Sequence, residues 1–77
     1  MTLRVEFTVE PFVEGAPGPH VDAAVAAAAD HGLEVDFGPF GSSAEGDDGS
    51  VLAAIDGVVR AAMGAGATRC TFQVSRI

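Results

Sequence analysis

A short segment rich in glycine and serine carries the side chains best suited to holding a small molecule. It spans residues 38–46 and reads Gly-Pro-Phe-Gly-Ser-Ser-Ala-Glu-Gly. Ser42 and Ser43 offer hydroxyl groups, and Phe40 offers an aromatic ring. Gly41 allows a ligand or another backbone to approach closely. An ordinary β-hairpin turn would use the same residue types, so turn chemistry alone leaves the two interpretations equally open.

Residue patterns typical of catalysis are missing from the sequence. His20 and His31 flank one predicted helix eleven positions apart, which does not place them in one metal ligand set; such histidines usually lie at the surface or cap a helix. The chain has no Gly-x-Ser-x-Gly, no Cys-x-x-Cys and no phosphate loop with lysine. Cys70 is the only cysteine, and a reduced thiol of this kind is more often a small core residue than a nucleophile. We therefore expect a binding protein rather than an enzyme, with no metal and no cofactor.

The charge of the chain bears on its partners. The formal net charge is −7, lysine is absent, and the basic residues are Arg4, Arg60, Arg69 and Arg76. An acidic surface repels phosphate backbones, so we expect no nucleic-acid partner. It suits a neutral or cationic ligand, although a salt-adapted or alanine-rich proteome would give the same bias.

We expect a cytoplasmic protein with no membrane partner. No stretch reaches the ~18 apolar residues that a bilayer span requires. The N-terminus also lacks the basic and apolar regions of a signal peptide.

Apolar periodicity predicts strands and helices. Alternation predicts half-buried strands over residues 3–10, 33–37 and 69–75, and a weaker signal predicts a short strand over 42–46. Helical spacing predicts one helix from Pro19 to about Asp30, ended by Gly32. A second helix begins near residues 47–50, with Ser50 or Asp48 as its cap. Its predicted apolar stripe consists of Val51, Leu52, Ile55, Val58, Val59, Ala62 and Met63.

This order predicts one domain over residues 1–77, an α+β ferredoxin-like βαββαβ sandwich. Right-handed crossovers place both helices on one face of an antiparallel four-stranded sheet. The other face is polar and can be solvated or can form a subunit interface. Its predicted residues are Arg4, Glu6, Thr8, Glu10, Glu34, Asp36, Thr71, Gln73 and Ser75.

A chain of 77 residues builds a small core. Domains of this size usually need disulfides, a metal or oligomerisation for stability. One cysteine excludes an internal disulfide, so we expect self-association to a dimer or tetramer.

Several short motifs occur in a characteristic order. The first strand closes with Val9-Glu10-Pro11, and residues 32–42 read Gly-Leu-Glu-Val-Asp-Phe-Gly-Pro-Phe-Gly-Ser. Glu45-Gly46 precedes the second helix, and residues 66–69 lead into a polar-alternating strand. In this order and spacing the chain resembles the small thiamine-binding, YkoF-like protein family over nearly its whole length.

The resemblance implies a ferredoxin-like fold in dimers or tetramers that binds thiamine, or its hydroxymethylpyrimidine part, without catalysis. Family members usually carry threonine where Ser42 stands, and serine keeps the hydroxyl. Ser42 and Ser43 can hold the aminopyrimidine, whereas Glu6 or Glu45 and the ring of Phe40 can favour the thiazolium cation. Two alternatives stay open: another small-molecule sensor of the same fold, such as an amino-acid-binding regulatory domain, and a structural oligomer without a ligand.

Overall fold

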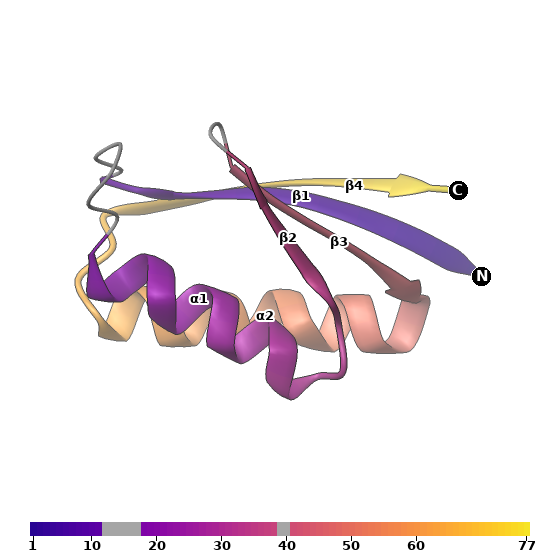
Figure 1. Ribbon diagram of the computed structural model, residues 1–77, viewed down its shortest axis with the longest axis horizontal. Helices are drawn as coiled ribbons and strands as arrows, with labels where there is room; N and C mark the ends of the chain where they lie inside the picture. Colours follow the sequence, from indigo (N-terminus) through magenta and orange to yellow (C-terminus); the bar gives the residue numbers. More distant parts are fainter. Residues whose placement is uncertain (12–17, 39–40) are drawn as a thin grey trace.

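The computed structural model describes residues 1–11, 18–38 and 41–77, which form a βαββαβ unit. The elements are β1 (Thr2–Glu10), α1 (Pro19–Asp30), β2 (Val35–Gly38), β3 (Gly41–Asp47), α2 (Asp48–Gly64) and β4 (Arg69–Arg76). The strands form one antiparallel sheet in the order β2-β3-β1-β4, and both helices lie on the same side of it (Figure 1). This confirms the predicted ferredoxin-like α+β fold.

The core lies between the sheet and the two helices. Alternation along β1 buries one side chain in two, and the short side chains of α1 let it pack closely against α2 and the sheet. Leu3, Val5 and Phe7 pack on the helix side, and Leu33 joins them from the loop after α1. On the helices the most deeply buried residues are Val51, Val58, Ala24, Ala28 and Ala62.

The ends of both helices follow local sequence signals. Pro19 is the first residue of α1, and Gly32 has a φ of 78° just after that helix, as predicted. The predicted N-cap of α2, Ser50 or Asp48, was wrong, because Asp47 is the N-cap residue. The hydroxyl and the backbone N–H of Ser50 donate to the carboxyl of Asp47, at 2.7 and 3.0 Å. These hydrogen bonds lower the pKa of Asp47.

Several side chains that the sequence placed in the core are exposed. On α2, Leu52 and Met63 are about half exposed, at 55% and 49%, and on β4 Val74 is 44% exposed. The core below α2 is instead completed by Ala54. The helices cover the middle of the sheet, so an apolar residue near the β4 edge can satisfy the periodicity without being covered.

His20 also differs from its predicted surface position. Its side chain is buried at the start of α1, and its Nε2 donates a hydrogen bond to the carbonyl oxygen of Pro11. His31 is exposed beyond the end of α1, with its Nδ1 3.0 Å from the carbonyl oxygen of Ala27. The first histidine therefore ties α1 to the end of β1.

Candidate ligand-binding site

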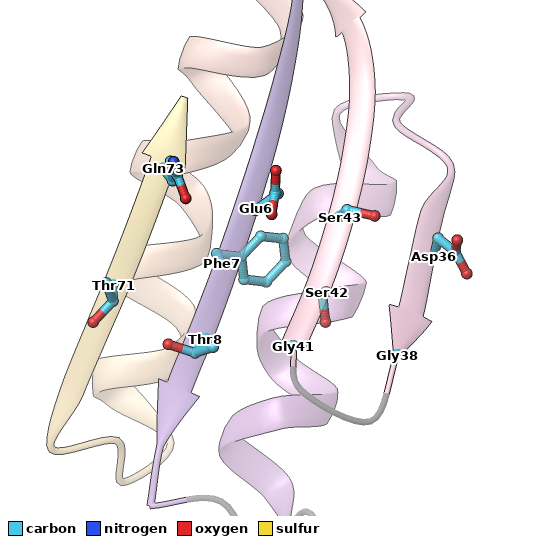
Figure 2. Close-up of a pocket in the computed structure, with 10 residues that line it drawn as sticks. All are labelled: Glu6, Phe7, Thr8, Asp36, Gly38, Gly41, Ser42, Ser43, Thr71 and Gln73. Carbon is cyan, nitrogen blue, oxygen red and sulfur yellow. The ribbon is translucent and has the colours of Figure 1, made fainter. Parts of the chain in front are cut away.

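The face of the sheet opposite the helices carries a row of polar side chains that crosses all four strands. Strand register pairs Gln73 with Glu6, Glu6 with Ser43, and Ser43 with Asp36. Directly paired residues on one face have Cβ atoms ~4.5–5.5 Å apart. The row therefore presents an amide, two carboxylates and a hydroxyl side by side on β4, β1, β3 and β2 (Figure 2).

Beside this row the sheet is hollowed because the next positions on β2 and β3 are glycines. Thr71 pairs with Thr8, and Gly38 pairs with Gly41. A Cβ built on Gly41 would lie 3.0 Å from Cγ2 of Thr8, so β3 approaches β1 closely here. The resulting hollow has a volume of about 400 Å³, within the range of small-molecule sites. Its described lining residues are Glu6, Phe7, Thr8, Asp36, Gly38, Gly41, Ser42, Ser43, Thr71 and Gln73.

Two ion pairs lie on this face, one on each side of the hollow along the strands. Arg4, two residues before Glu6 on β1, forms an ion pair with Glu45 of β3 at 2.6 Å. Arg69 of β4 forms an ion pair at 2.5 Å with Glu10, which lies two residues beyond Thr8 on β1. The hydrogen bond and charge of Arg69 lower the pKa of Glu10, and those of Glu10 raise the pKa of Arg69. Both arginines thus already have acidic partners on the same face.

The carboxylates inside the hollow differ from those at its borders. Among the ion pairs of the described residues, none involves Glu6 or Asp36. The described lining residues include no arginine, lysine, histidine or cysteine. The hollow is therefore negatively charged and rich in hydrogen-bonding groups, which favours a cationic or neutral polar ligand over an anion.

A second, smaller cavity of about 250 Å³ lies on the helix side of the sheet. Its lining is mainly apolar, from Val9 on β1, Val21 and Val25 on α1, and Phe37 on β2. Ser42 pairs with Phe7, whose side chain is buried on the helix side, so the Ser42 side chain points to that side as well. Its side chain is buried.

The structure therefore divides the predicted binding residues. Glu6 and Ser43 lie in the row beside the glycines, and Gly41 helps to form the hollow. Ser42 borders both cavities but directs its side chain to the smaller one. Glu45 is absent from the described lining and is paired with Arg4. Phe40 lies outside the described residues.

Sequence reasoning did not assign Asp36, Gln73 or Thr71 to the site, although it placed all three on the polar face. Their membership depends on strand register, because the pairing Gln73–Glu6–Ser43–Asp36 brings Asp36 and Gln73 into one row, and Thr71 pairs with Thr8 in the next. Alternation gives the face that a residue occupies but not its neighbour on the next strand. Within the described residues no group of three or more histidine, cysteine or acidic side chains is arranged to hold a metal ion.

Comparisons with known proteins identify the fold. No protein-family model matches the sequence, and no curated protein sequence matches it. The structure is similar to DUF77, a domain of unknown function from Bacillus cereus, with a TM-score of 0.70 and 20% identity over 97% of this chain and 73% of the other. It is similar to a hypothetical protein from Methanocaldococcus jannaschii, with a TM-score of 0.72 and 20% identity over 99% and 81%.

A third similar structure is a Thermotoga maritima protein provisionally assigned to thiamine biosynthesis or salvage. The TM-score is 0.69 and the identity is 22%, over 97% of this chain and 81% of that protein. At these identities the likeness establishes the fold that the chain shares with these proteins. In the described residues no helix has both the length and the apolar character needed to cross a membrane.

Proposed function

We propose that this domain binds thiamine, or its hydroxymethylpyrimidine part, in the hollow on the open face of the sheet. The row Gln73–Glu6–Ser43–Asp36 beside the glycine positions is the observation that carries the proposal. Thiamine combines a permanent cation with a planar aminopyrimidine that has both donors and acceptors. The sequence resemblance and the provisional thiamine assignment of the Thermotoga maritima neighbour support the same ligand.

Each side chain of the row has a chemical part in this proposal. Glu6 and Asp36 favour the thiazolium cation by charge, because neither is paired with a basic residue among the described ion pairs. Ser43 and Gln73 supply hydrogen bonds to the aminopyrimidine. Gly38 and Gly41 leave the sheet backbone open to a flat ring.

We propose binding without catalysis. The described lining residues offer carboxylates, hydroxyls and one amide, but no histidine that could activate a serine as a nucleophile. An amino-acid ligand is less well supported, because its carboxylate needs a cation and both nearby arginines are paired. A structural oligomer without a ligand would leave the hollow and its two carboxylates, Glu6 and Asp36, without a role.

Self-association is part of the proposal. The core is small, and the largest fully buried side chains among the described residues are those of Val51 and Val58. A domain of 77 residues with such a core gains stability from contact with another copy. We expect a dimer or a tetramer.

Calorimetry with thiamine on charge variants tests the ligand and the site together. Glu6→Gln should weaken thiamine binding about 1.4- to fivefold, since an exposed ion pair is typically worth ~0.2–1 kcal/mol. Glu45→Gln is the matched control, because Glu45 lies on the same face but bonds to Arg4 outside the hollow. It should leave the affinity almost unchanged.

The salt dependence separates the two parts of the ligand. Thiamine affinity should fall modestly as salt rises, because the charge attraction is screened. Hydroxymethylpyrimidine lacks the cation and should show little salt dependence or response to Glu6→Gln. If millimolar thiamine gives neither heat nor a shift in melting temperature, the ligand assignment is wrong and the fold assignment stands.

A further inference from the structure

The sheet has two unequal edges. The order β2-β3-β1-β4 leaves β2 and β4 at the outside, with four and eight residues respectively. Short edge strands are protected against pairing with other chains, whereas long ones offer a row of backbone donors and acceptors. β4 contains no proline and no lysine, which are common protective residues at an edge. The β4 edge is therefore open to strand addition.

The backbone groups that face outward on β4 can be identified. The N–H of Ile77 donates to the carbonyl oxygen of Thr2 at 3.1 Å, so odd-numbered residues exchange hydrogen bonds with β1. Cys70, Phe72 and Val74 consequently direct their N–H and C=O groups away from β1. The same residues pair with Val9, Phe7 and Val5, so their side chains lie on the helix side.

An apolar surface on α2 is continuous with this edge. Leu52, Val59 and Met63 lie on one face of α2 and are 55%, 36% and 49% exposed. Ile55, beside them on α2, lines a small gap together with Phe72 of β4. α2 and β4 lie on the far side of the molecule in Figure 1, behind α1 and β2. The surface formed by Leu52, Val59, Met63 and Val74 is named the α2–β4 surface below.

Charge makes the α2–β4 surface suitable for a second copy of the same acidic chain. The protein carries a net charge of −7, yet β4 contains two arginines and no acidic residue. On α2 the acidic group nearest the stripe in sequence, Asp56, is bonded to Arg60 at 2.9 Å. Repulsion between two copies is therefore weaker here than at the acidic hollow.

We propose that two copies associate through the α2–β4 surface, with their β4 strands paired antiparallel about a two-fold axis at Phe72. In this register Phe72 meets its own symmetry mate and Cys70 meets Val74 of the other copy, so all helix-side residues stay on one face. The axis also passes beside Ile55, near the middle of the α2 stripe, so the two stripes pack against each other. The inference specifies the self-association proposed above and is independent of the ligand.

The dimensions of the protomer agree with a stable dimer. The protomer measures 34 by 22 Å along its two longest axes, and Figure 1 looks along the third. The outline of that face is about 750 Å², so it has room for an interface near the ~800 Å² per partner of a standard protein complex. Isologous contact through one such face closes the assembly at two copies.

Disulfide trapping tests the register directly. The Val74→Cys variant, with its native Cys70, should form a covalent dimer on mild oxidation, since paired residues with Cα atoms ~5.5 Å apart can be bridged. Alkaline conditions help, because burial raises the pKa of Cys70. Ser75→Cys is the matched control: its side chain lies on the open face, next to position 74, and should cross-link far more slowly.

A proline variant tests the edge without a new thiol. Val74→Pro removes an outward N–H that the β1–β4 ladder does not use, so the protomer should fold but sediment as a monomer. Circular dichroism checks the fold, and thiamine calorimetry on the folded variant reports on the hollow separately. The proposal is overturned if wild-type protein sediments at 7.7 kDa at micromolar concentration. It is equally overturned if Val74→Cys cross-links no faster than Ser75→Cys, or if Arg76→Cys cross-links fastest.

Discussion

Replacing Gly41 with alanine tests whether the hollow depends on the glycines of β2 and β3. Gly41 has a φ of 150°, in the region that L residues rarely adopt. An added Cβ would lie 2.9 Å from the carbonyl oxygen of Phe7 and 3.0 Å from Cγ2 of Thr8. The first of these atoms belongs to the backbone of a central strand, so it cannot yield without moving β1.

The expected loss of stability follows from two contributions. The backbone strain costs ~1–3 kcal/mol and the overpacking against β1 costs a similar amount, so we expect a total of about 2–6 kcal/mol. A domain of 77 residues has a free energy of unfolding of about 4–12 kcal/mol. The variant should therefore lose a large part of its stability, with a melting temperature lower by about 10–50 °C.

Chemical denaturation of Gly41→Ala and Gly64→Ala gives the measurement and its control. Gly64 ends α2, has no neighbouring atom within 4 Å of an added Cβ, and is not among the glycines with positive φ. Gly64→Ala should be neutral or stabilising by up to ~1 kcal/mol. Equal midpoints for Gly41→Ala and the wild type would refute the close approach of β3 to β1 and, with it, the account of the hollow.

Two further predictions concern the core and the acid limb of stability. Val58→Ala should destabilise by about 2–3 kcal/mol, since it removes buried methyl groups, whereas Arg60→Ala, at an exposed position of the same helix, should cost much less; thermal unfolding that ranks them equally would mean that the register of α2 is wrong. The pKa values of Asp47 and Glu10 are lowered by their partners. Both carboxylates therefore stabilise the fold fully at a pH above the ordinary pKa of such groups, near ~4, and this contribution is lost as the pH falls below that value. Asp47→Asn should therefore lower stability at neutral pH and flatten the decline in acid, as followed by thermal unfolding between neutral and acidic buffers.

The fold could be predicted because each element carries its own local signal. Unbroken alternation from Leu3 to Glu10 indicates β1, and Pro19 and Gly32 mark the two ends of α1. The segment with the weakest signal, β3, also has the largest share of small residues. There the position in the sheet, between β1 and β2, supplies the order that local propensity does not.

The candidate site could be predicted only in part, because it depends on pairing between strands distant in sequence. Alternation assigned Glu6 and Gln73 to the polar face, but only register makes them neighbours. The same limit affects Ser42 and Ser43, which are equivalent as hydroxyl groups in the sequence. A strand directs consecutive side chains to opposite faces, so Ser43 points to the hollow on the open face, whereas Ser42 borders both cavities and points to the smaller one.

The stripe on α2 shows why periodicity overestimates the core. Val51, Val58 and Ala62 face the sheet, while Leu52, Val59 and Met63 follow the same helical repeat one residue later. Both sets are apolar, and periodicity merges them into one wide stripe. A wide stripe on a helix next to an open sheet edge is therefore itself a signal for a second contact, beyond the one with its own sheet.

The open face combines two features that do not favour the fold of an isolated domain. Glycine inside a strand packs nothing and loses more backbone entropy on folding than other residues, and Gly38 and Gly41 face each other across β2 and β3. On the neighbouring row Glu6 and Asp36, which take part in none of the ion pairs among the described residues, flank one serine. Under the proposed function, a flat cationic ligand would cover the glycine backbone and offset the two negative charges in one event. The arrangement that weakens the free domain would then be the one from which such a ligand gains its affinity.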